Sequence, residues 1–123
     1  MTTLNEILVN KKKSCKSIWF MRQAGRYLPE YKKIRNKKKN FIQLCLSPKL
    51  AAEISLQPIT RFNFDGIILF SDILIVPYAL GQDVQFKETV GPILKPLKKY
   101  TDLPKTYQED WKKKLAPVLK TIK

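Results

Sequence analysis

The sequence contains no histidine, and this absence excludes several common kinds of active site. Ser-His-Asp triads, Cys-His dyads and histidine-rich metal sites all need the imidazole ring. Only two cysteines are present, Cys15 and Cys45, and they lie 30 residues apart, without the spacing of a zinc motif. We expect both to be reduced thiols in a cytosolic protein. Any chemistry that this chain performs therefore depends on Arg, Asp, Glu, Lys or Tyr.

Long apolar runs and acidic residues are also scarce. No run approaches the ~20 apolar residues that a membrane span needs. The chain has 24 Lys and Arg against 10 Asp and Glu, a net charge of +14. The excess lies at the ends: residues 1–40 carry +10 and residues 91–123 carry +6, whereas residues 41–90 carry −2. The lysine runs indicate a solvated surface, although a basic field also attracts polyanionic ligands.

Local signals predict five helical segments or turns. Thr3 opens a capping box before a short amphipathic helix. Pro29 and Pro48 each suit the first turn of a helix, and Asn40 is placed to cap the turn between them. A second capping box, Thr106 to Glu109, predicts a final helix.

Two short apolar runs, residues 18–21 and 66–70, predict buried strands. Strands that are apolar on both faces are typical of parallel sheets covered by helices. Residues 84–88 alternate in polarity and predict a half-exposed strand or arm, and Gly and Pro residues between 91 and 96 predict a loop. This order indicates the α/β class. Because two parallel strands do not form a stable sheet alone, we expect the chain to be the opening portion of a larger α/β protein.

The first candidate site is the pair Arg22 and Arg26, directly after the first predicted strand. Loops that follow strand C-termini build the ligand sites of α/β proteins, and guanidinium groups bind carboxylates or phosphates through planar forks. The pattern is short, however, and two arginines that form surface ion pairs explain it equally well.

The second candidate is Asp72, just after the run 66–70. A carboxylate at such a strand end can act as a general acid, a general base or a hydrogen-bond acceptor. The alternatives are that Asp72 caps the following helix, or that it forms an ion pair with an arginine without any ligand.

Residues 19–31, WFMRQAGRYLPEY, closely resemble the N-terminal signature of the uroporphyrinogen decarboxylase family. The resemblance extends over about residues 5–123. Its other well-matched segments are residues 47–53, 56–59, 64–74 and 79–81.

This resemblance implies a fold and an activity. The family folds as a single (β/α)8 TIM barrel, usually dimeric and cytoplasmic. It converts uroporphyrinogen III to coproporphyrinogen III by decarboxylating four acetate side chains, without a metal or organic cofactor. Residues 1–123 would then be the N-terminal segment of one barrel domain whose remainder is absent, and we expect this segment to be inactive alone. Its ligand would be a small molecule rather than a nucleic acid or a membrane.

The resemblance also implies roles for particular residues. Arg22, Arg26 and, further along, Arg35 would bind substrate carboxylates, and the backbone between the first two would line the same cleft. Asp72 would be catalytic, accepting hydrogen bonds from the pyrrole N–H groups and stabilising the cation formed during decarboxylation. The implied substrate-binding residues are Arg22, Gln23, Ala24, Gly25, Arg26, Arg35 and Asp72.

An alternative interpretation treats the chain as a small basic protein that binds RNA or another polyanion through its lysine runs. Such binding would weaken steeply with added salt. The apolar run 66–70 counts against this interpretation, because a lone strand of this kind would leave unpaired edges exposed.

Overall fold

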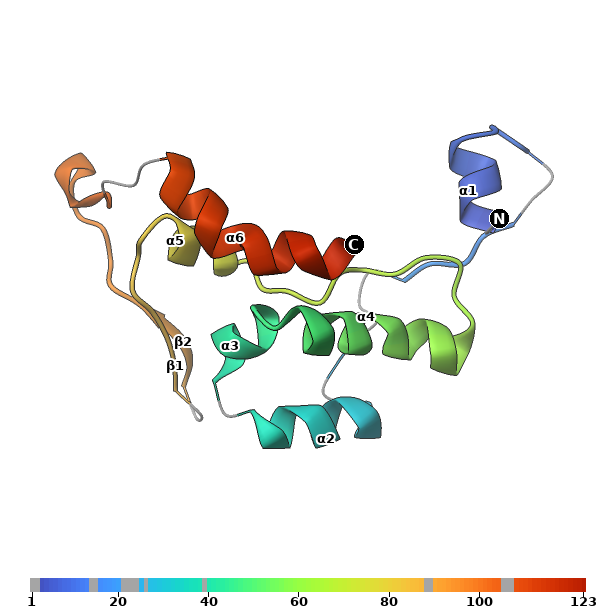
Figure 1. Cartoon of the computed structure of the whole chain (residues 1–123), viewed down its shortest axis with the longest axis horizontal. Helices are drawn as coiled ribbons and strands as arrows, with labels where there is room; N and C mark the ends of the chain where they lie inside the picture. Colours follow the sequence, from blue (N-terminus) through green and yellow to red (C-terminus); the bar gives the residue numbers. More distant parts are fainter. Residues whose placement is uncertain are drawn as a thin grey trace.

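The computed structural model describes residues 3–13, 16–20, 25, 27–38, 40–87, 90–104 and 108–123. Within them, helix α4 (Pro48–Phe62) is central: α2, α3 and α6 pack against it, and α5 packs against α6. Figure 1 shows α4 lying between α2 and α6. The other elements are α1 (Thr3–Leu8), α2 (Pro29–Lys37), α3 (Phe41–Cys45), α5 (Ile75–Ala79), β1 (Val84–Lys87), β2 (Gly91–Leu94), the 3₁₀ helix η1 (Tyr100–Asp102) and α6 (Gln108–Ile122).

Most of the predicted helices are confirmed, and their boundaries follow from local chemistry. Helices α2 and α4 begin at Pro29 and Pro48, where the missing N–H costs no helical hydrogen bond. The side chain of Asn40 accepts a hydrogen bond from the backbone N–H of Gln43 (3.1 Å), as expected of an N-cap. Thr106, in the capping box predicted before α6, lies outside the described residues.

The predicted strand over residues 84–88 is confirmed as β1 up to Lys87, and Glu88 lies outside the described residues. The predicted loop after it is wrong at its start. Residues Gly91–Leu94 form β2, which pairs antiparallel with β1 from Val84↔Leu94 to Lys87↔Gly91. Pro92 is compatible with this hairpin because both strands of a two-stranded sheet are edge strands. Gly91 and Pro92 therefore belong to a strand, whereas Pro96 lies after it, outside any helix or strand.

Within the described residues, the two predicted buried strands are not formed as strands; Met21, at the end of the first, lies outside those residues. Residues 16–20 and 64–70 are extended and run side by side in the same direction (Figure 1). Asp65 links them: its backbone N–H donates to the carbonyl of Ile18 (3.2 Å), and its carboxylate accepts from the backbone N–H of Ile18 (2.9 Å).

The expectation that these segments are buried is also wrong. Ile18, Trp19 and Phe20 are about half exposed (59%, 48% and 56%), and Ile67 and Ile68 of the second segment are 42% and 38% exposed, because the described helices and strands leave these side chains uncovered. The described part of the chain thus has a mixed α/β fold with one small antiparallel sheet, and it does not close into a barrel.

Phe70 connects the two halves of the hydrophobic core. Its ring packs on the cluster formed by Leu28, Tyr31, Leu44 and Ile54, and also on the cluster formed by Ile42, Cys45 and Ile75. Its backbone N–H donates to the hydroxyl of Ser55 on α4 (2.7 Å), and that hydroxyl donates to the carbonyl of Ala51 (2.7 Å). Because Ser55 is buried, this bond holds the end of the segment 64–70 against α4.

Replacement of Ser55 by Ala should destabilise the chain. The change leaves the N–H of Phe70 without the partner that the structure shows, at a cost of about 1–3 kcal/mol. The measurement is the free energy of unfolding from urea denaturation followed by circular dichroism. The control is Thr60→Ala, which removes an exposed hydroxyl that bonds only within α4, to the carbonyl of Leu56. If both variants lose the same free energy of unfolding, the Ser55–Phe70 hydrogen bond adds no more stability than an exposed hydroxyl does.

Candidate functional site

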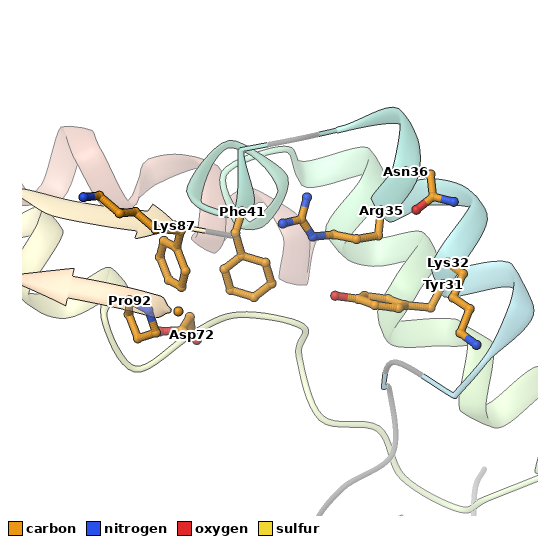
Figure 2. A pocket seen from close by; sticks show the side chains of 10 residues that line it. Tyr31, Lys32, Arg35, Asn36, Phe41, Asp72, Lys87 and Pro92 are labelled. Atoms are coloured by element: carbon orange, nitrogen blue, oxygen red, sulfur yellow. The ribbon is translucent and has the colours of Figure 1, made fainter. Parts of the chain in front are cut away.

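A cavity of about 450 Å³ lies between α2, the start of α3, the loop after Phe70 and the β1–β2 hairpin (Figure 2). It contains two of the residues singled out from the sequence, Arg35 and Asp72, which are 37 positions apart in the chain. The lining residues are Tyr31, Lys32, Arg35, Asn36, Phe41, Asp72, Phe86, Lys87, Gly91 and Pro92.

Helix α2 presents Arg35 to this cavity. The guanidinium group lies over the ring of Phe41, 5.8 Å from its centroid, and donates a hydrogen bond to the carbonyl of Lys38. Figure 2 shows the guanidinium extending from α2 toward that ring. A cation over an aromatic face is attracted to the ring's negative quadrupole, so Phe41 helps to orient the charge of Arg35.

Asp72 lies in the loop on the other side of the cavity. One carboxylate oxygen, Oδ1, accepts a hydrogen bond from the backbone N–H of Leu74 (2.9 Å), and the Asp72 carbonyl accepts from the N–H of Ile75 (3.1 Å). These bonds form a turn that leads into α5, which is close to the helix-capping role considered as an alternative. The two roles are compatible, because a carboxylate offers about four acceptor positions over its two oxygens.

Aromatic rings form the apolar wall of the site. The ring of Phe41 lies 5.0 Å from that of Phe86 and 5.9 Å from that of Phe70, measured between centroids. The ring of Tyr31 lies 5.8 Å from that of Phe70. These tilted contacts join α2, α3, the loop and β1 into an apolar surface. The charged residues that line the cavity beside it are three cations, Lys32, Arg35 and Lys87, and one carboxylate, Asp72.

Cys45 is buried behind this site and responds to both charges. Burial, and to a lesser degree the negative charge of Asp72, raises the pKa of its thiol to about 12, and the positive charge of Arg35 opposes this rise. The prediction of a reduced thiol agrees with this environment for Cys45, whereas Cys15 lies outside the described residues.

Of the other predicted site residues, the structure describes only Gly25. Arg22, Gln23, Ala24 and Arg26 lie outside the described residues. Gly25 is described: its carbonyl accepts from the N–H of Leu28 (3.1 Å), and it does not line the cavity. A Cβ at this position would lie 3.1 Å from the ring of Tyr27, so the backbone approaches that ring closely.

Tyr31, Phe41 and Phe86 contribute to the site but were not predicted as functional residues. The sequence does contain a signal for Tyr31: this residue lies four positions before Arg35, so the two share one face of α2. No such signal exists for Phe41 and Phe86, which reach the cavity from α3 and β1 only through tertiary packing.

A second cavity, of about 510 Å³, lies between α2 and α4 and contains none of the predicted site residues. Arg61 and Glu30 form an ion pair at its edge, with Nε 2.9 Å from Oε1 and Nη2 3.2 Å from Oε2. This hydrogen bonding lowers the pKa of the Glu30 carboxyl and raises that of the Arg61 guanidinium. The pair joins the beginning of α2 to the end of α4.

The described ranges show neither a membrane-spanning helix nor a group of metal-binding side chains. None of the helices found there is both long and apolar enough to span a bilayer. Nor do three or more Cys, Asp or Glu side chains in those ranges gather in a way that would hold a metal ion.

The fold and the cavity define an α/β protein whose pocket combines a guanidinium, two lysines, a carboxylate and aromatic walls, a combination suited to an acidic ligand. The chain belongs to the uroporphyrinogen decarboxylase (URO-D) family, whose model matches residues 2–123. This membership confirms the resemblance seen in the sequence.

Individual relatives agree with the family assignment. Over 106 residues, or 86% of this chain, it is 56% identical to a uroporphyrinogen decarboxylase of Rickettsia felis, 55% identical to one of Rickettsia canadensis and 49% identical to one of a Chelativorans species. The chain spans only about 30% of the length of these curated relatives.

The buried state of Cys45 predicts slow alkylation. In a Cys15→Ser background, iodoacetamide at pH 8 should modify Cys45 far more slowly in the folded chain than in 6 M guanidinium chloride, by about three orders of magnitude from the pKa shift alone. The reason is that the neutral thiol is not the nucleophile. Mass spectrometry of timed samples gives both rates. Equal rates in the two solvents would contradict the burial and the raised pKa.

Proposed function

We propose that this chain supplies the N-terminal part of the substrate cleft of a uroporphyrinogen decarboxylase. The reaction is the decarboxylation of the four acetate side chains of uroporphyrinogen III to give coproporphyrinogen III, in tetrapyrrole biosynthesis. The observation that supports the proposal most directly is that Arg35 and Asp72, far apart in the sequence, line one cavity. Cations and a carboxylate beside aromatic walls in one pocket match a substrate with acidic arms around a ring of N–H donors.

The arginines bind the acidic arms in this proposal. Arg22, Arg26 and Arg35 form charge-assisted hydrogen bonds with substrate carboxylates, and the backbone of Gln23, Ala24 and Gly25 lines a part of the substrate cleft beyond the cavity that Arg35 and Asp72 share. The surplus of basic residues in the chain, +14 overall, increases the local concentration of a substrate with eight carboxylates.

Asp72 acts at the centre of the macrocycle. It accepts hydrogen bonds from pyrrole N–H groups, and its negative charge stabilises the cation that forms when a pyrrole carbon is protonated before carbon dioxide leaves. The turn into α5 holds the carboxylate in place, because Oδ1 accepts from the N–H of Leu74. Such a fixed charge needs no reorganisation during the reaction.

We further propose that residues 1–123 form the first part of a (β/α)8 barrel, within a cytoplasmic homodimer that needs no metal or organic cofactor. The arrangement of residues 16–20 and 64–70 supports this: they are extended, adjacent and run in the same direction, as the first two strands of a parallel barrel would (Figure 1). Their exposed apolar side chains, Trp19 and Ile67 among them, suit burial by further strands and helices.

The role of Asp72 is tested in a chimera in which this chain replaces the matching segment of the Rickettsia felis enzyme. Asp72→Asn should reduce kcat by at least about 100-fold, because the amide does not carry the charge that stabilises the cation. Coproporphyrinogen formation is measured by chromatography after oxidation to the porphyrin. The matched control is Asp83→Asn, an exposed carboxylate outside the cavity. An active chimera whose kcat is unchanged by Asp72→Asn would refute the proposed role.

The role of Arg35 is tested in the same chimera. Arg35→Ala should raise KM about 10- to 100-fold, because it removes a charge-assisted hydrogen bond to a substrate carboxylate. Lys33→Ala is the control, since Lys33 is an exposed cation on the same helix and does not line the cavity. If both variants raise KM equally, the arginine acts only through general electrostatic attraction.

A further inference from the structure

Tyr31 and Arg35 enter the same cavity from successive turns of α2. They are four residues apart, so their side chains lie on one face of the helix. Figure 2 shows the phenol oxygen of Tyr31 and the guanidinium of Arg35 both extending from α2 toward the space beside Phe41. A hydroxyl donor and a cation are therefore presented to the cavity together.

The ring of Tyr31 is held firmly. Only 6% of the residue is exposed, and it belongs to the core cluster with Leu28, Leu44 and Ile54. Its ring also contacts that of Phe70, at 5.8 Å between centroids. A buried ring with its polar tip at a cavity wall presents a donor at little cost in conformational entropy.

A carboxylate has two oxygens, and these two side chains can bind them together. The guanidinium of Arg35 supplies charge and a planar fork, and the phenol of Tyr31 supplies one O–H donor from the neighbouring turn. We propose that Tyr31 is a specificity-determining residue that donates its O–H to the same substrate carboxylate that Arg35 binds. This inference rests on the proposed function, because it assigns a residue to the binding of that substrate's acidic arms.

The competing interpretation is that Tyr31 only fills the core. The two differ in what the hydroxyl does: Tyr31→Phe keeps the ring in the core and removes the donor. It also leaves the net charge of the chain unchanged, so non-specific attraction between this basic chain and a polyanion is the same before and after.

The experiment measures the binding of uroporphyrin, a stable porphyrin with eight carboxylates, to the 123-residue chain by fluorescence anisotropy. Salt at 0.5 M suppresses the long-range attraction. The variants are Tyr31→Phe, Arg35→Ala and Tyr100→Phe; the last removes a hydroxyl from a tyrosine that is 89% exposed and outside the cavity. We expect Kd to rise about 10-fold for Tyr31→Phe, to rise for Arg35→Ala, and to stay unchanged for Tyr100→Phe.

A second measurement uses the wild-type chain, in case Tyr31→Phe does not fold. Tyrosine labelled with ¹³C at Cζ gives one resonance for each of the five tyrosines, and that of Tyr31 is assigned by elimination from the other Tyr→Phe variants. Uroporphyrin should shift the Tyr31 resonance and leave that of Tyr100 in place.

The outcomes separate this inference from the proposed function. If Arg35→Ala weakens binding but Tyr31→Phe does not, or the Tyr31 resonance does not move, the role of Tyr31 is overturned and the proposed function stands. If the wild-type chain does not bind uroporphyrin, the inference is overturned as well, and the activity of the Asp72 chimera then decides the proposed function independently.

Discussion

The hydrogen bond between the Ser55 hydroxyl and the backbone N–H of Phe70 is the constraint on which the candidate site depends. It joins the end of an extended segment to the middle of α4, where the hydroxyl is buried and already bonded to the carbonyl of Ala51. Phe70 then inserts its ring between the two core clusters. Asp72 follows two residues later, so the position of its carboxylate derives from this attachment.

The opposite wall of the cavity depends on α2 and on its connection to α3. Tyr31 packs in the core and thereby holds α2 in place. The side chain of Asn40 caps the start of α3, and the next residue, Phe41, lies beneath the guanidinium of Arg35. Charge and apolar surface are thus combined: Arg35 and Asp72 face a cavity whose rings belong to the same core that stabilises the chain.

The candidate site was predictable only where short-range information sufficed. Arg22, Arg26 and Asp72 were identified by their place after apolar runs and by the family resemblance, and Arg35 by the resemblance alone; the structure brings Arg35 and Asp72 to one cavity. Phe41 and Phe86 were not identified, because neither belongs to a local pattern that indicates a ligand. Their contribution arises from a ring contact between α3 and β1, two elements that the sequence alone does not bring together.

The sequence by itself determined where most helices begin, since Pro29, Asn40 and Pro48 act on the backbone within one turn of themselves. It also determined family membership, through a signature too long to arise by chance. Tertiary structure alone decided that residues 16–20 and 64–70 are extended rather than paired strands, and that Gly91–Leu94 is a strand. The physical reason is that a strand exists only with a partner, and an apolar run does not specify which segment will supply its hydrogen bonds.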